Sequence, residues 1–295
     1  MKILYNRTFH NHNNESAIEG SYRFSEWKGN LQEVYANGEE YISLVHKESY
    51  IKQIRLACAR KQLFAEVYLT PESYTAACQA VGLAIKASEQ GDFAAVRPPG
   101  HHAERDKSVG FCLFNNIAIA VQKLVNKGKK VFILDIDSHH GNGTQSIFYD
   151  SDRVFYASIH ELYSYPFTGF PGETGEGKGK GYTLNIPLVA GSGDKQYLEM
   201  LEKALEAGRR FTPDVVAVSA GFDGYRKDRL LQLDLTLKAY YESGFMIRRS
   251  FSEVFAVLEG GYHEDIRQCT EHFVEGINVG ARPRPNTFDH EMSVG

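Results

Sequence analysis

The sequence predicts an α/β fold built around a parallel, doubly wound β-sheet, and three observations support this prediction. First, short apolar segments recur along the chain, and several are continuous runs of Val, Ile, Leu, Phe and Ala, which is typical of strands covered on both faces. Second, longer segments with a helical pattern separate them, as βαβ units require. Third, polar clusters follow several apolar segments, and ligands of such folds bind beyond the carboxyl ends of the strands.

The predicted strands coincide with these apolar segments. VFILDID and VVAVSA are the strongest examples, because almost every residue in them is apolar until the segment ends. The full set of predicted strands comprises residues 2–5, 93–96, 131–137, 154–159, 183–187, 215–220 and 254–260.

The predicted helices fill the intervals between the strands. Pro71 favours a helix that starts at the next residue, and Asp194 is a candidate cap for the helix that begins there. The full set comprises residues 48–61, 72–90, 114–128, 194–210, 234–250 and 264–279. The chain shows no internal repeat and no long low-complexity linker, so we expect residues 1–295 to form one domain.

Composition and charge argue against several function classes. The 295 residues carry a net charge of −4, which is unlike a general nucleic-acid-binding surface. No apolar run approaches the roughly 20 residues that cross a bilayer, and MKILYNRTFH lacks a secretory leader pattern, so no membrane partner is expected. The four cysteines show no C-x-x-C spacing, which favours reduced thiols and a cytoplasmic location. The oligomeric state is unknown from the sequence.

The segment LDIDSHHGNG carries candidate metal ligands. If the strand persists to residue 139, its alternation points Asp135, Asp137 and His139 to one side. A carboxylate and an imidazole two residues apart suit a divalent metal such as zinc, and Asp223 is the best third ligand. The alternative is a salt-bridged strand end, since buried acids need partners. That alternative is disfavoured because a second histidine cluster accompanies these residues.

This second cluster is RPPGHHAERD, in which His101 and His102 follow two prolines that restrict the loop. Imidazoles that act on a water molecule need a partner on the other ring nitrogen to fix the tautomer. Asp135 and Asn142 are available as such partners. Tyr262 follows two glycines, and a phenol there can polarise a substrate carbonyl. A single tyrosine at a strand end is more often part of the core, so the cluster as a whole carries this hypothesis.

Together these motifs resemble the zinc-dependent histone deacetylase family. RPPGHHA with GFCLFNN, LDIDSHHGNGTQSIFYD, SAGFD and LEGGY occur in the family's order between about residues 40 and 280. The similarity is greatest to class II-like members, bacterial acetylpolyamine amidohydrolases and acetoin-utilisation proteins. The resemblance implies an arginase/deacetylase fold, with a central, mostly parallel sheet of about eight strands and helices on both faces.

The resemblance also implies roles for individual residues. The expected zinc ligands, for which Fe²⁺ is the alternative ion, are Asp137, His139 and Asp223. The expected catalytic group consists of His101, His102, Tyr262, Asp135 and Asn142. The expected substrate tunnel comprises Gly110, Phe111, Phe170, Leu230, Gly260 and Gly261. A structural potassium ion is expected at Asp135, Asp137, His139, Ser158 and Ile159, and a second such site at Phe148, Ser151, Val154 and Tyr182.

The implied activity is hydrolysis of acetyl or related acyl groups from the ε-amine of lysine. An acetylated small amine such as an acetylpolyamine is the alternative substrate, and a non-catalytic acyl-lysine binder is the remote alternative. Polyamine-specific relatives typically carry a long insertion in the segment that is short here, between His46 and Pro71, which favours acyl-lysine. Three departures from the family pattern leave the substrate open. Residues 10–30 lack H-P-E-R-P-x-R, and Arg229 and His263 stand where proline and asparagine are frequent.

Two rival interpretations fail on the residues themselves. Residues 172–178 match the start of a phosphate-binding loop, but Gly179 follows instead of Ser or Thr. An arginase-like site with two metal ions needs additional carboxylates. Gly224 and Tyr225 follow Asp223, so the second acid of a D-x-D pattern is missing and a single ion is favoured.

Overall fold

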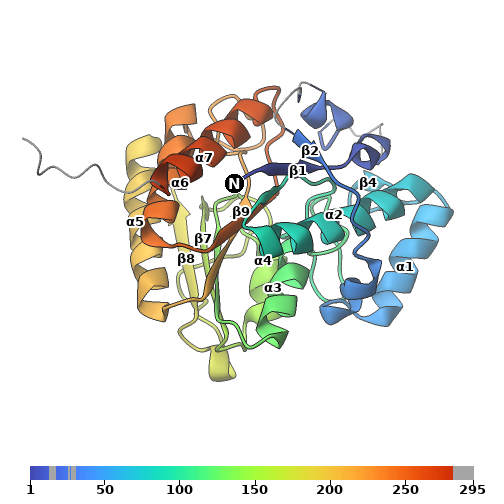
Figure 1. Ribbon diagram of the computed structural model, residues 1–295, viewed down its shortest axis with the longest axis horizontal. Coiled ribbons are helices and arrows are strands. Elements are labelled where there is room, and N and C mark those ends of the chain that lie inside the picture. Colours follow the sequence, from blue (N-terminus) through green and yellow to red (C-terminus); the bar gives the residue numbers. More distant parts are fainter. Residues whose placement is uncertain (13–17, 26, 28–30, 282–295) are drawn as a thin grey trace, which may run out of the picture.

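The computed structural model describes residues 1–12, 18–25, 27 and 31–281, and an eight-stranded sheet lies at its centre (Figure 1). The strand order is β2-β1-β5-β10-β9-β6-β7-β8, and all neighbours are parallel. The bounds are β1 Ile3–Tyr5, β2 Leu31–Glu33, β5 Phe93–Ala94, β6 Val131–Asp135, β7 Val154–Glu161, β8 Thr183–Leu188, β9 Val215–Ala220 and β10 Val254–Leu258. The prediction of a parallel sheet of this size is confirmed.

The strands missed in the sequence are short and lack a continuous apolar run. The edge strand β2 has the sequence LQE, two of whose residues are exposed. An antiparallel hairpin, β3 Leu63–Phe64 and β4 Val67–Tyr68, lies outside the main sheet. Central strands, by contrast, are buried along their whole length because helices cover both faces, and these are the strands that the sequence revealed.

Helices form a layer on each side of the sheet (Figure 1). One layer contains α5, α6 and α7, and the other contains α2 and α3, with α1 packed against α2. The bounds are α1 Glu48–Ala59, α2 Pro71–Gln90, α3 Asn116–Asn126, α4 Asn142–Phe148, α5 Asp194–Phe211, α6 Leu237–Ser250 and α7 Ile266–Gly280. Short 3₁₀ helices occur at Arg7–Asn11, Ser21–Phe24, Glu39–Leu44 and Gly177–Gly179.

Two helix starts were predicted from individual residues; one prediction is confirmed and the other is wrong. Pro71 opens α2, whose first turn is capped by the Thr70 and Ser73 side chains. Asp194 does not cap α5, because it is the first helical residue and Gly193 precedes it. Its carboxylate instead accepts hydrogen bonds from the backbone N–H and hydroxyl of Thr236, which ties the start of α5 to the start of α6.

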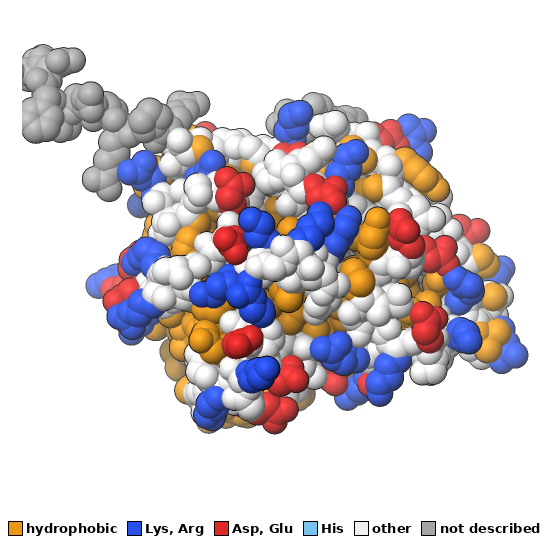
Figure 2. Space-filling model, turned by 60° about the horizontal axis from the view of Figure 1, so that its bottom comes forward, with side chains coloured by type: hydrophobic (Ala, Val, Ile, Leu, Met, Phe, Trp, Pro, Cys, Tyr) orange, Lys and Arg blue, Asp and Glu red, His pale blue; other side chains and the backbone are white. Residues whose placement is uncertain are grey.

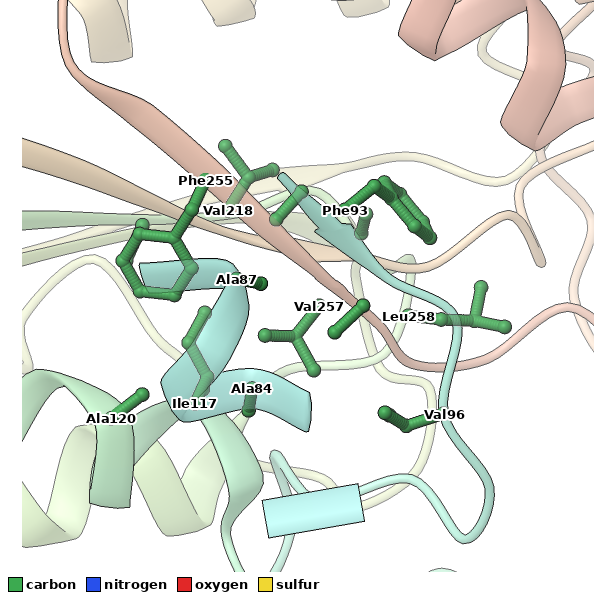
Figure 3. Packing of buried hydrophobic residues seen from close by; sticks show 14 of the residues in the cluster. Ala84, Ala87, Phe93, Val96, Ile117, Ala120, Val218, Phe255, Val257 and Leu258 are labelled. Carbon is green, nitrogen blue, oxygen red and sulfur yellow. The ribbon is translucent and has the colours of Figure 1, made fainter. Parts of the chain in front are cut away.

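The core fills both faces of the sheet. Figure 3 shows Phe255 and Val257 of β10 lying beside Ala84 of α2 and Ile117 of α3. On the other face, the ring of Phe93 lies 6.2 Å from that of Phe273 in α7. Full burial of a side chain such as Phe255 stabilises the fold by about 1.5–3 kcal/mol. The sheet is therefore a rigid platform for the loops at its carboxyl edge.

Two surface features bear on possible partners. Among the described residues, no helix combines the length and apolar character needed to cross a membrane. Figure 2 shows a face on which acidic and basic side chains are interspersed.

Candidate active site

The predicted catalytic residues converge because their strands are neighbours. Four adjacent strands, β5, β10, β9 and β6, lead at their carboxyl ends into the loops that carry the predicted residues. His101 and His102 follow β5, and Tyr262 follows β10. Asp223 follows β9, and Asp137 follows β6. Residues far apart in sequence therefore meet at one edge of the sheet.

Asp137, His139 and Asp223 form a buried group whose potential ligand atoms all lie within 4.8 Å of one another. The Nδ1 atom of His139 lies 2.6 Å from Asp223 Oδ2 and 3.2 Å from Asp137 Oδ1. Two carboxylate oxygens and one imidazole nitrogen are a donor set that zinc accepts.

The local backbone differs from the expected strand. β6 ends at Asp135, so strand alternation does not orient the residues that follow. Side-chain-to-backbone hydrogen bonds do so instead: the N–H of Asp137 donates to Asp135 Oδ1 at 3.2 Å, and the N–H of His139 donates to Asp137 Oδ1 at 2.9 Å. His140 does turn away, and its ring lies 5.0 Å from that of His160.

The electrostatics of this group fit a bound cation. Burial raises the pKa of Asp223, and the negative charge of Asp137 raises it further. Two carboxylates held this close out of water need a positive partner, and a divalent ion between them provides one. Gly260 leaves the necessary room, because a Cβ there would lie 2.6 Å from Asp137 Oδ2 and 2.7 Å from Asp223 Oδ2.

His101 and His102 have the partners that were predicted for them. His101 Nδ1 lies 3.2 Å from Asp135 Oδ2, and His102 Nδ1 lies 2.8 Å from Asn142 Oδ1. The two rings are 4.0 Å apart. Asn142 uses its NH₂ group on Glu104, so its oxygen accepts from His102 Nδ1 and leaves His102 Nε2 as the unprotonated nitrogen.

The pKa values of the two histidines diverge. Burial acts to lower the pKa of His101, but Asp137 and Asp135 outweigh burial and raise it to about 10. Burial lowers the pKa of His102 well below its usual range, and the neighbouring His101 and His139 lower it further. His102 is therefore neutral in the folded protein, as a general base must be.

Tyr262 is held by its backbone and its ring. Its N–H donates to Asp228 Oδ2 at 2.7 Å, and its ring meets that of Phe111 edge-to-face at 5.6 Å. The Arg23 guanidinium lies 5.1 Å from the ring centroid and donates to the carbonyl oxygens of Gly261 and Glu259. Burial raises the pKa of Tyr262 well above its usual range, so the phenol keeps its proton and can donate it in a hydrogen bond.

The expected tunnel residues are only partly brought together. Phe111 lies beside Tyr262, and Gly110 packs so closely on His102 that a Cβ would lie 2.4 Å from the ring. Phe170, however, is 41% exposed and its ring contacts Tyr163. The aromatic side chain beside the histidines is Tyr165, 5.4 Å from the His102 ring and 6.4 Å from the His139 ring.

The remaining predicted residues surround this group. Leu230 is 40% exposed, and its N–H donates to Asp228, the residue that also holds Tyr262. Gly261 has φ +114°, a value that glycine adopts without strain. Asp135 pairs with Ser158 in the register of β6 and β7, and the Ser158 hydroxyl lies 2.9 Å from His160 Nδ1. Ile159 follows within β7.

Sequence reasoning missed Glu259, which supports the histidine loop. Its Oε2 atom accepts hydrogen bonds from the N–H groups of Gly100 at 2.7 Å and His101 at 3.1 Å. Burial raises the pKa of Glu259 to about 7. The available signal was its position: an acid that ends a fully apolar strand needs a buried partner.

Comparison with known proteins gives the family. The model of the histone deacetylase domain matches residues 13–277. A probable deacetylase of Methanothermobacter thermautotrophicus is 37% identical over 309 residues, covering 97% of this chain and 93% of the relative. The acetylpolyamine amidohydrolase of Burkholderia pseudomallei is 41% identical over 204 residues, covering 68% and 60%. The crystal structure of the HDA15 HD domain superposes with a TM-score of 0.88 at 29% identity, covering 97% and 90%. The chain is a member of the histone deacetylase family, with its arginase/deacetylase fold and hydrolytic deacetylase activity.

Proposed function

We propose that this deacetylase removes acetyl or related acyl groups from lysine side chains in peptides or proteins. The observation that carries the proposal is the pair of buried histidines, one with a charged partner and one with a neutral partner, beside an Asp–His–Asp group. This arrangement supplies a neutral base next to a site for a divalent ion, and metal-dependent amide hydrolysis uses these two elements together.

Asp137, His139 and Asp223 would hold Zn²⁺, the ion typical of the family, with Fe²⁺ as the alternative. When bound, this ion supplies Lewis acidity to the acyl oxygen and to the attacking water. His102 Nε2 takes a proton from that water, whose oxygen forms a bond to the acyl carbon. The Tyr262 hydroxyl donates a hydrogen bond to the acyl oxygen as negative charge develops there.

The second half of the reaction returns the proton. The bond between the acyl carbon and the lysine nitrogen breaks, and His102 gives its proton to the departing amine. The products are a carboxylic acid and a lysine amine, and transfer of the acid proton to the amine leaves a carboxylate and a lysine ammonium. His101, whose Nδ1 lies 3.2 Å from Asp135 Oδ2, is paired with a carboxylate that favours its protonated form, so it keeps its own proton and contributes positive charge beside the reacting group.

Acetylpolyamines are the second candidate substrates, because one observation favours a cationic ligand. Glu66, an exposed acid in the turn between β3 and β4, is close enough to Tyr165 for its charge to affect that phenol. Burial raises the pKa of Tyr165 to about 12, and Glu66 adds to the effect. By contrast, the short segment between His46 and Pro71 supports a wide entrance to the substrate tunnel, which favours acyl-lysine as the substrate.

A kinetic panel separates these substrates. We expect kcat/KM to be highest for acetyl-lysine peptides and lower for acetylputrescine and acetylspermidine, and longer acyl-lysine peptides will define the acyl preference. A higher kcat/KM for the acetylpolyamines would reverse the order. Tight binding of acetyl-lysine peptide without turnover, in protein shown by elemental analysis to contain one zinc or iron per chain, would identify a non-catalytic binder.

Three further expectations belong to this proposal. The first is a potassium ion bound at Asp135, Asp137, His139, Ser158 and Ile159. If it binds there, the melting temperature of the protein should be higher in potassium chloride than in choline chloride. A cytoplasmic location is supported by the four cysteines, which are all buried free thiols. A single catalytic domain over residues 1–295 is supported by the one large sheet and by the family match to residues 13–277.

A further inference from the structure

The loop between β7 and β8 carries a group of aromatic side chains, which we call the aromatic ridge: Tyr163, Tyr165, Phe167 and Phe170. Tyr165 is half-buried, and the other three are exposed. Tyr163 is 75% exposed and Phe167 is 68% exposed. Large apolar side chains that are this exposed contribute little to the stability of the fold, because little of their surface is removed from water. Their presence in one short loop therefore calls for a contact outside the folded chain.

The backbone of the aromatic ridge strengthens this argument. Tyr163 has φ +62° and Phe167 has φ +65°, in the left-handed region that glycine occupies freely and bulky residues disfavour. Glycine at either position would relieve the backbone at almost no loss of packing. Strain of this kind concentrates at binding sites, where the surrounding structure enforces it.

A polar network that reaches from the buried His140 and His160 to the surface holds the loop in this conformation. Thr168 Oγ1 lies 2.8 Å from His140 Nδ1, and the Gly169 carbonyl accepts a hydrogen bond from His160 Nε2 at 3.0 Å. The N–H of Phe170 donates to Glu173 Oε1 at 3.0 Å.

The aromatic ridge extends from the catalytic histidines outward. The Tyr165 ring lies 5.4 Å from the His102 ring, and the Phe167 ring lies 6.4 Å from Tyr165. Tyr163 and Phe170 form the other ring pair of the loop, at 6.3 Å. An extended polypeptide advances about 3.3 Å per residue, so Phe167 lies about two residues from the point where an acyl-lysine would pass Tyr165.

From these observations we infer that the aromatic ridge binds the polypeptide on one side of the acyl-lysine, through aromatic contacts with the peptide planes and apolar side chains of the substrate. This inference rests on the proposed function, since it assigns a binding surface for the same substrate. It makes the enzyme selective for acyl-lysine within a polypeptide over isolated acyl-lysine.

The test compares two substrates that share one reacting group. One is an acetyl-lysine peptide with apolar residues on both sides, and the other is a single acetyl-lysine blocked at both ends. In the variant Tyr163→Gly/Phe167→Gly, we expect KM for the peptide to rise about tenfold with kcat unchanged. We expect kcat/KM for the blocked residue to change less than twofold and the melting temperature to be maintained or raised.

Thr212→Gly is the matched control, because Thr212 also has a left-handed φ of +53° but lies before β9, at the opposite end of the sheet. It should leave KM for both substrates unchanged. An unchanged peptide KM in the double variant, or an equal loss on both substrates, would overturn the inference. So would a wild-type dimer that the double variant converts to a monomer without a change in peptide KM. Absence of turnover of both substrates by the wild-type protein would instead refute the proposed function.

Discussion

His101 and His102 are adjacent in the chain and both buried, with ring centroids only 4.0 Å apart. Their hydrogen-bond partners nevertheless differ in charge. His101 lies against Asp135, and His102 lies against the neutral amide of Asn142. Burial acts to lower the pKa of both. At His101 the charges of Asp137 and Asp135 outweigh burial, whereas at His102 the charges of His101 and His139 add to burial and the charge of Asp137 does not offset them. The neighbouring charges, rather than burial, therefore decide which histidine is the base.

The largest expected effect comes from removing the neutral member of the pair. His102→Ala should lower kcat by about 10³-fold, because it removes the neutral imidazole that takes the proton from water. Steady-state kinetics on an acetyl-lysine peptide will measure the loss, with metal content and melting temperature as controls for an intact site. A decrease smaller than tenfold would show that His102 is not the base.

The second-largest effect is expected at Tyr262, which lies outside the histidine pair. Tyr262→Phe removes only the hydroxyl and should lower kcat by about 10²-fold while the fold is maintained. The Phe111 contact and the Asp228 hydrogen bond to the backbone do not depend on the hydroxyl, so the ring should stay in place. Near-normal turnover by a correctly folded variant would exclude Tyr262 as the donor to the acyl oxygen.

Asn142→Asp would give both histidines a charged partner. The new carboxylate should raise the pKa of His102, so that His102 is protonated at neutral pH and kcat/KM at pH 7 falls about tenfold. Activity should recover at higher pH, as the acid limb of the pH profile moves upward. A parallel loss at all pH values would contradict this electrostatic explanation.

Asp135→Asn is the reciprocal control for that experiment. It removes the charged partner of His101 but leaves Asn142 in place, so the acid limb of the profile, which belongs to His102, should not move upward.

The smallest expected effect concerns the carboxylate beneath the pair. Burial raises the pKa of Glu259 from 4.5 to about 7, so the folded state holds a proton that the unfolded state has lost. Its contribution to stability is complete below about pH 4.5 and is lost as the pH rises to about 7. Glu259→Gln should therefore raise the free energy of unfolding by about 2 kcal/mol at pH 8 and change it little at pH 4.5.

Denaturant unfolding across this pH range provides the measurement. The glutamine oxygen can still accept from the Gly100 and His101 N–H groups, so activity should fall no more than a few fold. An unchanged stability difference between pH 4.5 and pH 8 would argue against a protonated Glu259.

The sequence identified most of the sheet, because central parallel strands are continuous apolar runs that remain visible without a structure. It missed β2 and the β3–β4 hairpin, whose short strands contain exposed residues. The expected set of catalytic and metal-site residues came from the motifs, and the structure brings these residues together. Their local geometry was not predictable, since hydrogen bonds to side-chain oxygens, rather than strand alternation, orient Asp137 and His139.

Two features near the site, the aromatic loop and Glu259, could not be predicted from sequence patterns. Phe170 and Tyr165 belong to one aromatic loop, in which the Phe170 N–H donates to Glu173 Oε1 and Thr168 Oγ1 lies 2.8 Å from His140 Nδ1; these tertiary contacts hold the loop with Tyr165 beside the histidines. Glu259 acts through backbone N–H groups, which no side-chain motif specifies. Such contacts depend on tertiary structure and leave no periodic signal in the sequence.

The order of strands in the sheet has a consequence for synthesis of the protein. β10 lies between β5 and β9, so the last strand to be made separates the strands that carry His101 and Asp223. A nascent chain whose β10 segment is still inside the ribosome has a gap in the middle of its sheet, and it also lacks an accessible Tyr262, which follows β10. We therefore expect deacetylation to begin only after β10 and Tyr262 have left the ribosome.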